Sequence, residues 1–397
     1  MQLLEQYVQT LFESQDLLQT WRKRAWDRFQ EIGLPKPKQE AFQYVPLQHL
    51  SFPKAASAPI AIPQCPAKYA HRIFFVDGFF QSASLPPSLI CQPLNGAMKT
   101  YGIFLQNRFL RLLKEESDPF SALNGALHGC GAFLYVPPNV VIEEPIEIHH
   151  LFTSSSMGSP HLQVFLGKGS SVQLMQRASH EEALSFGNIR IDVSLDEGAS
   201  LFLGDEQRWP KDSVHFQTIR STLKRDSNFH FLSLSSGAKL SRSSIKVQLL
   251  EENSSALMQG LWRLDQELQS HTHIVVEHLA PHCRSRQHFK GVLKGRSRSS
   301  FEGKIFVAPQ AQKTEAYQLN NNLLLSDEAS ANAKPNLEVF ADDVKASHGA
   351  TIAQLQEEEL FYLCSRGLKR EDAKEILTRG FCDEILASAP RFFKEAL

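Results

Sequence analysis

The stretch IRIDVSLDEGASLFLG, residues 189–204, carries the pattern that decides the fold. Apolar and polar residues alternate on both sides of the short turn DEGAS at 196–200, and this period of two predicts two strands joined by a tight connection. Similar alternating strings recur through the middle of the chain, among them HLQVFL at 161–166, NFHFLSL at 228–234, SIKVQLL at 244–250 and THIVVEHL at 272–279. The middle of the chain is therefore expected to be mainly β.

The turns between these strings recur at a regular distance. Small residues mark them about every 28 residues, a period that indicates stacked repeats: Ser170, Ala199, Ser227, Ser254 and Cys283. No long helical pattern intervenes to form the crossovers of a doubly wound parallel sheet. Coils that bury one face against their neighbours build one long core, so the sequence predicts a β-solenoid, in the form of a right-handed parallel β-helix. A β-sandwich is the structural alternative, because short strands with regularly spaced turns fit it too.

Four regions follow from these patterns. Residues 1–50 are predicted to be an N-terminal helical region, and residues 51–129 a linker with small local elements. Residues 130–349 form the expected β-helix core, and residues 350–397 a C-terminal helical domain. In that domain Gly367 is placed to end a first helix, and the acidic residues Glu371 and Asp372 favour the start of a second one.

Composition excludes several classes of function. The 42 basic and 43 acidic residues nearly cancel, whereas a nucleic-acid-binding protein usually has a basic excess or a basic face. No apolar run approaches the roughly 20 residues that a membrane-spanning helix needs. The start, MQLLEQYVQTLFESQD, lacks the basic segment of a secretory signal, so we expect a cytoplasmic protein.

The six cysteines lie far apart in the sequence, at Cys65, Cys91, Cys130, Cys283, Cys364 and Cys382. They form no CxxC pair, so neither a zinc knuckle nor a dithiol redox motif is encoded locally. We expect free thiols that pack as small apolar side chains.

Two other groups of residues suggest chemistry less strongly. The string GKGSS at 167–171 lacks the remaining parts of a phosphate-binding GxxxxGK[ST] motif, and a tight solenoid turn explains it. The densest set of ligand-type residues is His271, His273, Glu277, His278, His282, Cys283 and His288. On a strand His271 and His273 share a face, which would suit zinc or iron, but the spacings match no metal motif. A solvated strand edge is the favoured interpretation.

The string DDVKASHGATIAQLQEEELFYLCSRGLKREDAKEILTRGF, residues 342–381, combines an acidic pair, a Ser-His-Gly turn and two helical stretches. A neutral imidazole such as that of His348 is a good iron ligand and a proton carrier near neutral pH. From the residues alone, however, a turn histidine that caps backbone groups is the favoured interpretation. The string closely resembles the C-terminal signature of the SufB/SufD family, the scaffold subunits of the SUF iron–sulfur cluster assembly system. Its DDVKxSHGAT and LFYLxSRG motifs point to the SufD branch, and GLPKPKQEAFQYVPL at 33–47 is similar to the N-terminal segment of such chains.

The resemblance implies a fold and a set of partners. It implies a flat β-helix core with helical domains at both ends, which pairs with the core of a SufB-like subunit. It implies that a nascent iron–sulfur cluster forms near the interface of the two cores, where His348 would contribute and would bind iron transiently. No cofactor is then expected to be bound stably by this chain alone. Flavin in the complex and a homodimer of the isolated chain are both left open.

The resemblance also implies that the C-terminal helices dock a SufC-like ATPase, which would supply the ATP-driven step of a subunit that is not itself an enzyme. The residues that we expect to serve this contact are Phe361, Tyr362, Arg366, Gly367, Ala373, Leu377, Gly380 and Phe381. A glycine inside a helix, such as Gly380, costs about 1 kcal/mol relative to alanine, which suggests close approach by another backbone.

The chain departs from the family pattern at two places. Many SufD-like chains have cysteine before the Ser-His pair, where this one has Ala346. The stretch QLNNNLLLSDEA at 318–329 resembles the place where SufB chains carry an essential cysteine, but Asn320, Asn321 and Asn322 stand there. Neither place supplies a thiolate, which favours the SufD branch over SufB.

A carbohydrate-active lyase or hydrolase is the alternative function, because many β-helices act on polysaccharides. Such an enzyme needs paired carboxylates or a basic residue that project from adjacent coils. The acidic residues of the middle region lie mainly in turns, as at Asp196-Glu197 and Glu251-Glu252, where solvation explains them. The scaffold interpretation is favoured.

Overall fold

A computed structural model of the chain describes residues 2–13, 16–36, 39–47, 50–56, 66–153, 155–181, 185–390 and 393. Cys65 lies outside the described residues. The helices are α1 (Gln2–Glu13), α2 (Gln19–Ile32), the short 3-10 helix η1 (Glu40–Phe42), α3 (Leu94–Glu115), α4 (Pro119–Leu127), α5 (Glu357–Ser365) and α6 (Arg370–Ala387). The strands of the N-terminal half are β1 (His71–Val76), β2 (Phe79–Ser84), β3 (Ile90–Pro93), β4 (Ala132–Val136), β5 (Ile146–Phe152), β6 (Met157–Gly158), β7 (His161–Leu166), β8 (Ser171–His180), β9 (Phe186–Leu195) and β10 (Ser200–Gln207).

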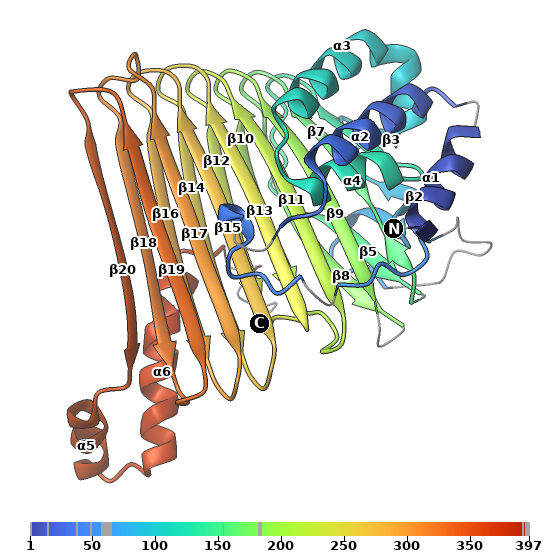
Figure 1. Cartoon of the computed structure of the whole chain (residues 1–397). Helices are drawn as coiled ribbons and strands as arrows, with labels where there is room; N and C mark the ends of the chain where they lie inside the picture. The colour runs from blue at the N-terminus through green and yellow to red at the C-terminus, as the bar shows by residue number, and fades with distance from the viewer. Residues whose placement is uncertain are drawn as a thin grey trace.

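The remaining strands are β11 (Val214–Leu223), β12 (Asn228–Ser235), β13 (Leu240–Leu249), β14 (Ser255–Leu264), β15 (Gln269–His278), β16 (Arg284–Leu293), β17 (Arg298–Val307), β18 (Glu315–Leu324), β19 (Ser330–Val339) and β20 (Lys345–Gln354). The strands form two sheets, ordered β2-β1-β5-β8-β10-β12-β14-β16-β18-β20 and β19-β17-β15-β13-β11-β9-β7-β4-β3, and from β7 onward successive strands alternate between them (Figure 1).

This architecture is a parallel β-helix, as the sequence predicted. From β4 onward each strand pairs in parallel with a strand of the next coil, for example β10 with β12 and β18 with β20. The β-sandwich alternative is wrong, because among the described strands antiparallel pairs occur only at the N-terminal edges of the sheets, between β1 and β2 and between β3 and β4. Paired residues lie 28 positions apart in one coil, Ser200 opposite Asn228, and 30 apart in the last coil, Glu315 opposite Lys345. The repeat of about 28 residues is therefore the length of one coil.

The turns on one side of the solenoid share a backbone conformation. Each contains a residue with positive φ, and these residues form a column along the molecule: Asn139, Gly169, Gly198, Asp226, Asn253, His282 and Lys313. The backbone N–H of each donates a hydrogen bond to a carbonyl of the next coil, from Asn139 to Lys168 at 2.8 Å through to Lys313 to Asp343 at 2.6 Å. Inter-coil hydrogen bonding thus continues through the turns and does not stop at the strand ends.

The small residues that revealed the repeat follow this column. The Ser227 hydroxyl donates to the Lys224 carbonyl at 2.6 Å, and the Ser254 hydroxyl donates to the Glu251 carbonyl at 2.9 Å. Thr314, at the equivalent place in a later coil, donates to the Ala311 carbonyl at 2.9 Å. A small or hydroxyl-bearing side chain is required there because it lies buried inside the turn and satisfies a backbone carbonyl.

The lumen between the two sheets holds the main core. Residues at alternate positions of each strand point inward and stack on their counterparts in the next coil, as Leu203, Phe231 and Met258 do. All three are buried. Each inward-facing strand position forms a buried column of side chains that runs from coil to coil. Together these columns give the solenoid a continuous apolar interior along most of its length.

The N-terminal helices cover the outer face of the second sheet. A separate apolar cluster joins α1–α4 to that face, with Trp21, Phe109 and Phe120 on the helices and Phe186 and Phe216 on the strands. The rings of Phe120 and Phe216 stack with centroids 3.8 Å apart. None of the helices in the described part of the chain is long and apolar enough to cross a membrane.

Residues 51–129 hold more structure than the predicted linker. β1 belongs to the solenoid, because it pairs in parallel with β5. The segment between them contains α3 and α4. In α3 the apolar residues Leu105, Phe109, Leu112 and Leu113 repeat at helical spacing. At the other end β20 continues to Gln354, so the strands extend past the predicted boundary at residue 349.

The C-terminal helices lie at the opposite end from α1–α4. α6 packs along the outer face of the first sheet, and α5 lies beyond it at the tip of the molecule (Figure 1). Cys382, Ile385 and Ala389 bury their side chains with Leu232 and Leu261 of the strands. The second half of α6 is therefore part of the solenoid's outer layer.

The lumen packing leads to a test of stability. Replacing Phe231 by alanine should lower the free energy of unfolding by about 3–5 kcal/mol, because its column cannot close over the missing ring. Replacing Phe361, whose side chain is 74% exposed, removes the same atoms and should change it by less than about 0.5 kcal/mol. Urea unfolding followed by circular dichroism measures both. Equal losses in the two variants would contradict the lumen position of Phe231.

Candidate functional site

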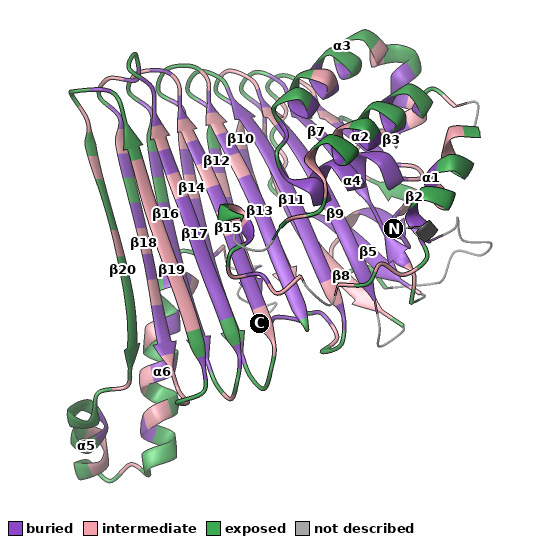
Figure 2. Ribbon diagram, in the orientation of Figure 1, coloured by how far each residue is buried: buried purple, intermediate pink, exposed green. Residues whose placement is uncertain are grey.

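The C-terminal end of the solenoid is open. Among the described residues β20 pairs only with β18, and β19 pairs only with β17, so one edge of each strand is unpaired. β20 is exposed along most of its length, in contrast to the buried strands of the middle coils (Figure 2). Exposed apolar side chains gather at this end, including Phe340 at 60% and Ile352 at 47%. An unpaired strand edge with exposed apolar side chains can pair with a strand of another chain.

His348 lies on β20, where it pairs in register with Gln318. The register relates Leu203, Phe231, Met258, Gln287, Gln318 and His348 as one column, from the middle of the solenoid to its end. The column changes from apolar to polar, and Gln318 donates a hydrogen bond to Gln287 at 3.0 Å. His348 is the exposed last member of this lumen column. It is therefore a strand residue on the last coil, whereas the sequence suggested a turn.

The three asparagines that stand in place of the SufB cysteine occupy β18, which pairs with the strand of His348. Asn320 and Asn322 are buried, and Asn322 donates a hydrogen bond to Asn320 at 2.7 Å. Asn321 points to the other face and donates to the hydroxyl of Thr351 on β20 at 2.8 Å. β18, β19 and β20 carry no cysteine, so Ala346 and the asparagines leave His348 without a thiolate on the last three strands.

The acidic pair before His348 occupies the last turn of the solenoid. Asp343 forms an ion pair with Lys313, and its carbonyl accepts the final hydrogen bond of the turn column. Lys345 next to it forms an ion pair with Glu315 at 3.3 Å. These exposed pairs tie the last coil to the one before it.

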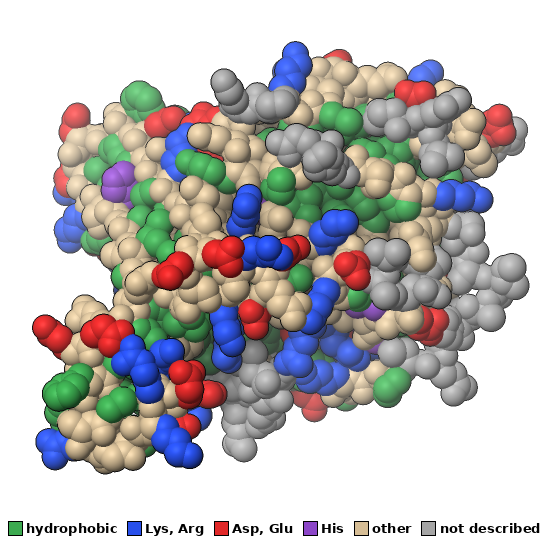
Figure 3. Space-filling view, turned by 60° about the horizontal axis from the view of Figure 1, so that its bottom comes forward, with side chains coloured by type: hydrophobic (Ala, Val, Ile, Leu, Met, Phe, Trp, Pro, Cys, Tyr) green, Lys and Arg blue, Asp and Glu red, His purple; other side chains and the backbone are tan. Residues whose placement is uncertain are grey.

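α5 exposes two of the residues expected to contact a partner, and two more follow directly at its C-terminal end. The side chains of Phe361 and Tyr362 are 74% and 58% exposed, and Arg366 lies over the Tyr362 ring at 5.3 Å. Gly367 ends α5 with a φ of 94°. The projecting C-terminal unit shows apolar side chains among charged ones (Figure 3).

α6 divides the remaining expected residues between two roles. Ala373 is buried, and Leu377 is half-buried. Phe381 lies 4.3 Å from the Lys290 ammonium, which also donates to the Phe381 carbonyl at 3.0 Å, so this residue helps to attach α6 to the solenoid. Gly380 is exposed, and no atom of the described chain lies within 4 Å of a Cβ built there. The close approach suggested for Gly380 is not made within the described part of this chain.

The histidine-rich cluster at 271–288 is dispersed by the fold. His271 bonds to the Ser300 hydroxyl at 2.8 Å, while His278 points into the lumen and bonds to the Ser285 hydroxyl at 2.8 Å. His282 is a turn residue with positive φ, and Cys283 is buried beside it. Within the described residues no group of three or more His, Cys, Asp or Glu side chains is placed to hold a metal ion.

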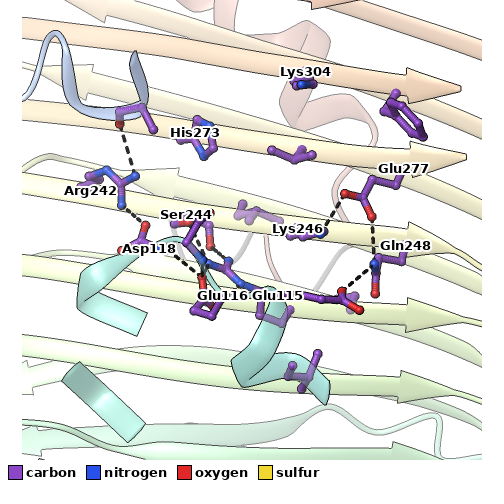
Figure 4. A pocket seen from close by; sticks show the side chains of 18 of the residues that line it. Glu115, Glu116, Asp118, Arg242, Ser244, Lys246, Gln248, His273, Glu277 and Lys304 are labelled. Carbon is purple, nitrogen blue, oxygen red and sulfur yellow. Dashed lines mark hydrogen bonds and ion pairs between the residues drawn. The ribbon is translucent and has the colours of Figure 1, made fainter. Parts of the chain in front are cut away.

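A charged pocket of about 370 Å³ lies where α3 and α4 meet β11, β13 and β15 (Figure 4). Arg220 donates two hydrogen bonds to Glu116, at 2.7 and 2.9 Å. Arg242 forms an ion pair with Asp118 at 2.5 Å. On the far side Lys246 forms an ion pair with Glu277 at 2.8 Å. Each of these charges is matched within the pocket, so the cluster joins the helical layer to the sheet.

Burial and charge set the protonation states in this pocket. Burial alone would raise the pKa of Asp118, but the charges of Arg242 and Arg220 outweigh it and lower the pKa to about 2. Burial, with a contribution from Arg242, lowers the pKa of His273 to about 3, so its imidazole is neutral. The carboxylates that a glycoside-cleaving enzyme would need are already held by arginine and lysine, which does not favour the lyase or hydrolase alternative.

The fold and site together define a class of protein. The distinctive features are an exposed solenoid end and an exposed helical tip. Two family models match the chain: the SufBD core domain of the SUF system for iron–sulfur cluster assembly over residues 150–381, and the SufBD protein N-terminal region over residues 64–148. The chain belongs to the SufB/SufD family.

Individual relatives agree with this assignment. An iron–sulfur cluster assembly SufBD family protein of Synechocystis is 29% identical over 98% of this chain and 91% of its own length. A SufBD family protein of Pyrococcus horikoshii is 30% identical over 76% of this chain and 68% of its own. The iron–sulfur cluster assembly protein SufD of Escherichia coli is 36% identical over 44% of this chain and 41% of its own. Family membership supports a role in iron–sulfur cluster assembly as an assembly subunit, not as an enzyme.

The sequence did not reveal the ion pairs of Figure 4, because their partners lie far apart along the chain. Glu116 and Arg220 are separated by 104 positions, and Asp118 and Arg242 by 124. The one local signal was Asp118-Pro119, an N-cap followed by a proline that begins α4. That signal predicts a helix start but names no distant partner.

The Asp118 ion pair gives a pH-dependent test. Asp118→Asn keeps an N-cap for α4 but leaves buried Arg242 without its counter-charge, and should cost about 3–5 kcal/mol at pH 7. The folded pKa of about 2 lies below the ordinary 3.8. The stabilisation is therefore present above pH 3.8 and lost as pH falls toward 2. Urea unfolding from pH 7 to pH 3 should show the difference between wild type and variant shrinking below about pH 4.

Asp343→Asn is the matched control, because it breaks an exposed ion pair with Lys313. Its effect should stay within about 1 kcal/mol. If Asp118→Asn were as mild as Asp343→Asn, the buried pair would not stabilise the contact between helices and sheet.

Proposed function

We propose that this chain is the SufD-type scaffold subunit of an iron–sulfur cluster assembly complex. It pairs through the open end of its solenoid with the core of a SufB-like subunit and carries a SufC-like ATPase on its C-terminal helices. The observation that carries the proposal is the unpaired, exposed end formed by β19 and β20, where His348 is the last residue of a lumen column.

The open end supports pairing with another solenoid. Unpaired strand edges bind extended strands through backbone hydrogen bonds, and exposed apolar side chains add contact area. Phe340 and Ile352 provide such side chains. A second copy of this chain would compete for the same edge, which is how an isolated chain would form a homodimer.

His348 supports a place for the cluster at that interface. Its imidazole is exposed, and a neutral imidazole can ligate iron or carry a proton near neutral pH. The last three strands offer no cysteine, so sulfur ligands would come from the partner. The iron–sulfur cluster is the cargo of this site, held transiently between two chains. Flavin, if the complex uses it, would serve the assembled complex as a whole.

α5 and the first half of α6 support docking of the ATPase. Phe361 and Tyr362 are exposed at the tip, and the chain has no GxxxxGK[ST] motif of its own. ATP-driven change would therefore reach the scaffold through a partner. The second half of α6 is occupied by the solenoid, which leaves the tip as the docking surface.

The role of His348 is tested in cells that co-express the chain with its partner subunits. His348→Ala should leave solubility and complex mass unchanged and lower the yield of assembled cluster several-fold. His282→Asn is the matched control, because His282 is exposed in a turn with positive φ that asparagine also adopts. Purification, mass measurement and absorbance of the bound cluster give the readouts. An unchanged cluster yield in His348→Ala would leave this histidine with no role in assembly.

The docking surface is tested by a double substitution of Phe361 and Tyr362 to alanine. Loss of two aromatic anchors should weaken capture of the ATPase by at least about tenfold, since each buried aromatic contributes about 1.5–3 kcal/mol. Truncation is a poorer test, because α6 covers apolar residues of the first sheet. Phe340→Ala, at the open end, should weaken pairing with the SufB-like subunit and spare the ATPase. Full capture by the double variant would place the ATPase elsewhere.

A further inference from the structure

A second cleft lies on the N-terminal half of the molecule, away from the open end. It has a volume of about 690 Å³ and is lined by α3 and by the strands and turns of the second sheet under it. α3 has a kink at Tyr101, where φ is −114° and ψ is 16°. Phe104, one turn later, is 54% exposed and packs on Phe165 with ring centroids 4.8 Å apart. Aromatic side chains therefore form part of the cleft wall: Tyr101, Phe104, Phe133, Tyr135 and Phe165.

Arg108 lines this cleft and is almost completely buried, with 7% of its surface exposed. Its guanidinium lies 4.7 Å from the centre of the Phe165 ring. It donates to the Val193 carbonyl at 2.7 Å and to the Thr222 hydroxyl at 3.4 Å. Its Nε is buried and has no hydrogen-bond partner among the described residues. A buried guanidinium normally has a carboxylate partner, and this one has only neutral acceptors.

The charges around Arg108 are unbalanced. In the described part of the chain, neither Arg108 nor Arg111, one turn further along α3, forms an ion pair, although both line the cleft. Asp196, the carboxylate in the lining, already accepts a hydrogen bond from Lys224 at 3.0 Å. Burial lowers the pKa of Arg108 to about 10. The negative charge of Asp192 raises this pKa, and the positive charges of Arg111 and Arg190 lower it further. The cleft therefore holds an excess of positive charge.

We propose that this cleft binds a small anion with a planar aromatic body. Its acidic group would lie beside Arg108 and Arg111, and its ring would lie against Phe104 and Phe165. Guanidinium groups bind carboxylates, sulfonates and phosphates through paired hydrogen bonds, and aromatic walls accept flat rings. The volume is in the range of about 300–1,000 Å³ that small-molecule sites occupy. The site is independent of the open end and of the C-terminal helices.

Two fluorescent probes of nearly the same shape test the proposal with the full chain. 8-Anilinonaphthalene-1-sulfonate carries the anionic group, and N-phenyl-1-naphthylamine is the same molecule without it. The sulfonate should bind more tightly by about tenfold, as expected for one charge-assisted contact. Inorganic phosphate at millimolar concentration should compete with the sulfonate and leave the neutral probe bound. Equal affinity for the two probes would overturn the proposal.

Substitutions then test whether the probe binds in this cleft. Arg111→Ala should remove most of the preference for the sulfonate, whereas Lys114→Ala, which removes an exposed charge from α3 outside the cleft, should keep it. Phe104→Ala should weaken both probes, and Ile103→Ala, an exposed neighbour that does not line the cleft, should weaken neither. Arg111 and Phe104 are exposed, so these variants should fold.

A further control tests whether the probe binds to another exposed apolar surface of the molecule instead of the cleft. Phe361→Ala should leave binding of the sulfonate probe unchanged, because α5 lies at the other end of the molecule (Figure 1). If Phe361→Ala weakened binding as much as Phe104→Ala, or if Arg111→Ala and Lys114→Ala had equal effects, the probe would not lie in this cleft and the proposal would be wrong.

Discussion

Parallel pairing between successive coils is the constraint on which this structure depends. Each coil must return to the same register as the one before it, or every inward side chain would move to the outer face. The turn column meets this requirement with one residue of positive φ in each coil, whose N–H bonds to the next coil, as Asn253 does to Pro281. Because the turns themselves are hydrogen-bonded, coil length stays nearly constant, and Phe231 can stack on Met258.

A stack of this kind has two ends, and the protein treats them differently. At the N-terminal end the antiparallel strands β2 and β3 form the edges of the two sheets. At the C-terminal end β20 is exposed and β19 is mostly half-buried, and each strand has one edge unpaired among the described residues. In a solenoid each coil is stabilised by its neighbours, so the last coil has a neighbouring coil on one side only. The change from apolar Met258 to polar Gln287, Gln318 and His348 along one column follows the same direction, from the apolar interior to the exposed end.

The helical layers are attached by two kinds of contact. Aromatic packing, as between Phe120 and Phe216, joins the N-terminal helices to the second sheet, and buried ion pairs fix where they lie along it. In each of those ion pairs the positive charge is matched by a carboxylate of the same pocket. The charges in the pocket of Figure 4 therefore serve to hold the helices on the sheet. The cleft beside α3 is different, because Arg108 is buried without a contacting carboxylate. In the pocket of Figure 4 the charged side chains pair with one another, whereas in the cleft beside α3 the Arg108 guanidinium has no carboxylate partner among the described residues and is the group that we propose binds a ligand.

The sequence by itself determined the β-helix, its repeat and the family. Alternation in strings such as IRIDVSL follows from the two faces of each strand, and the small residues at Ser227 and Ser254 follow from the space inside each turn. Both signals are local, so they can be read along the chain. The sequence also placed the two C-terminal helices, whose observed bounds are Glu357–Ser365 and Arg370–Ala387.

Only the tertiary structure decided which residues share a site. It placed His348 on the last strand in register with Gln318, dispersed the histidines of 271–288 over different faces, and divided α6 between the solenoid and the tip. It also placed two helices, α3 and α4, in the predicted linker, and so formed the cleft around Arg108. These outcomes depend on contacts between positions as far apart as Asp118 and Arg242, which no local pattern encodes. Packing across coils, and not spacing along the chain, sets them.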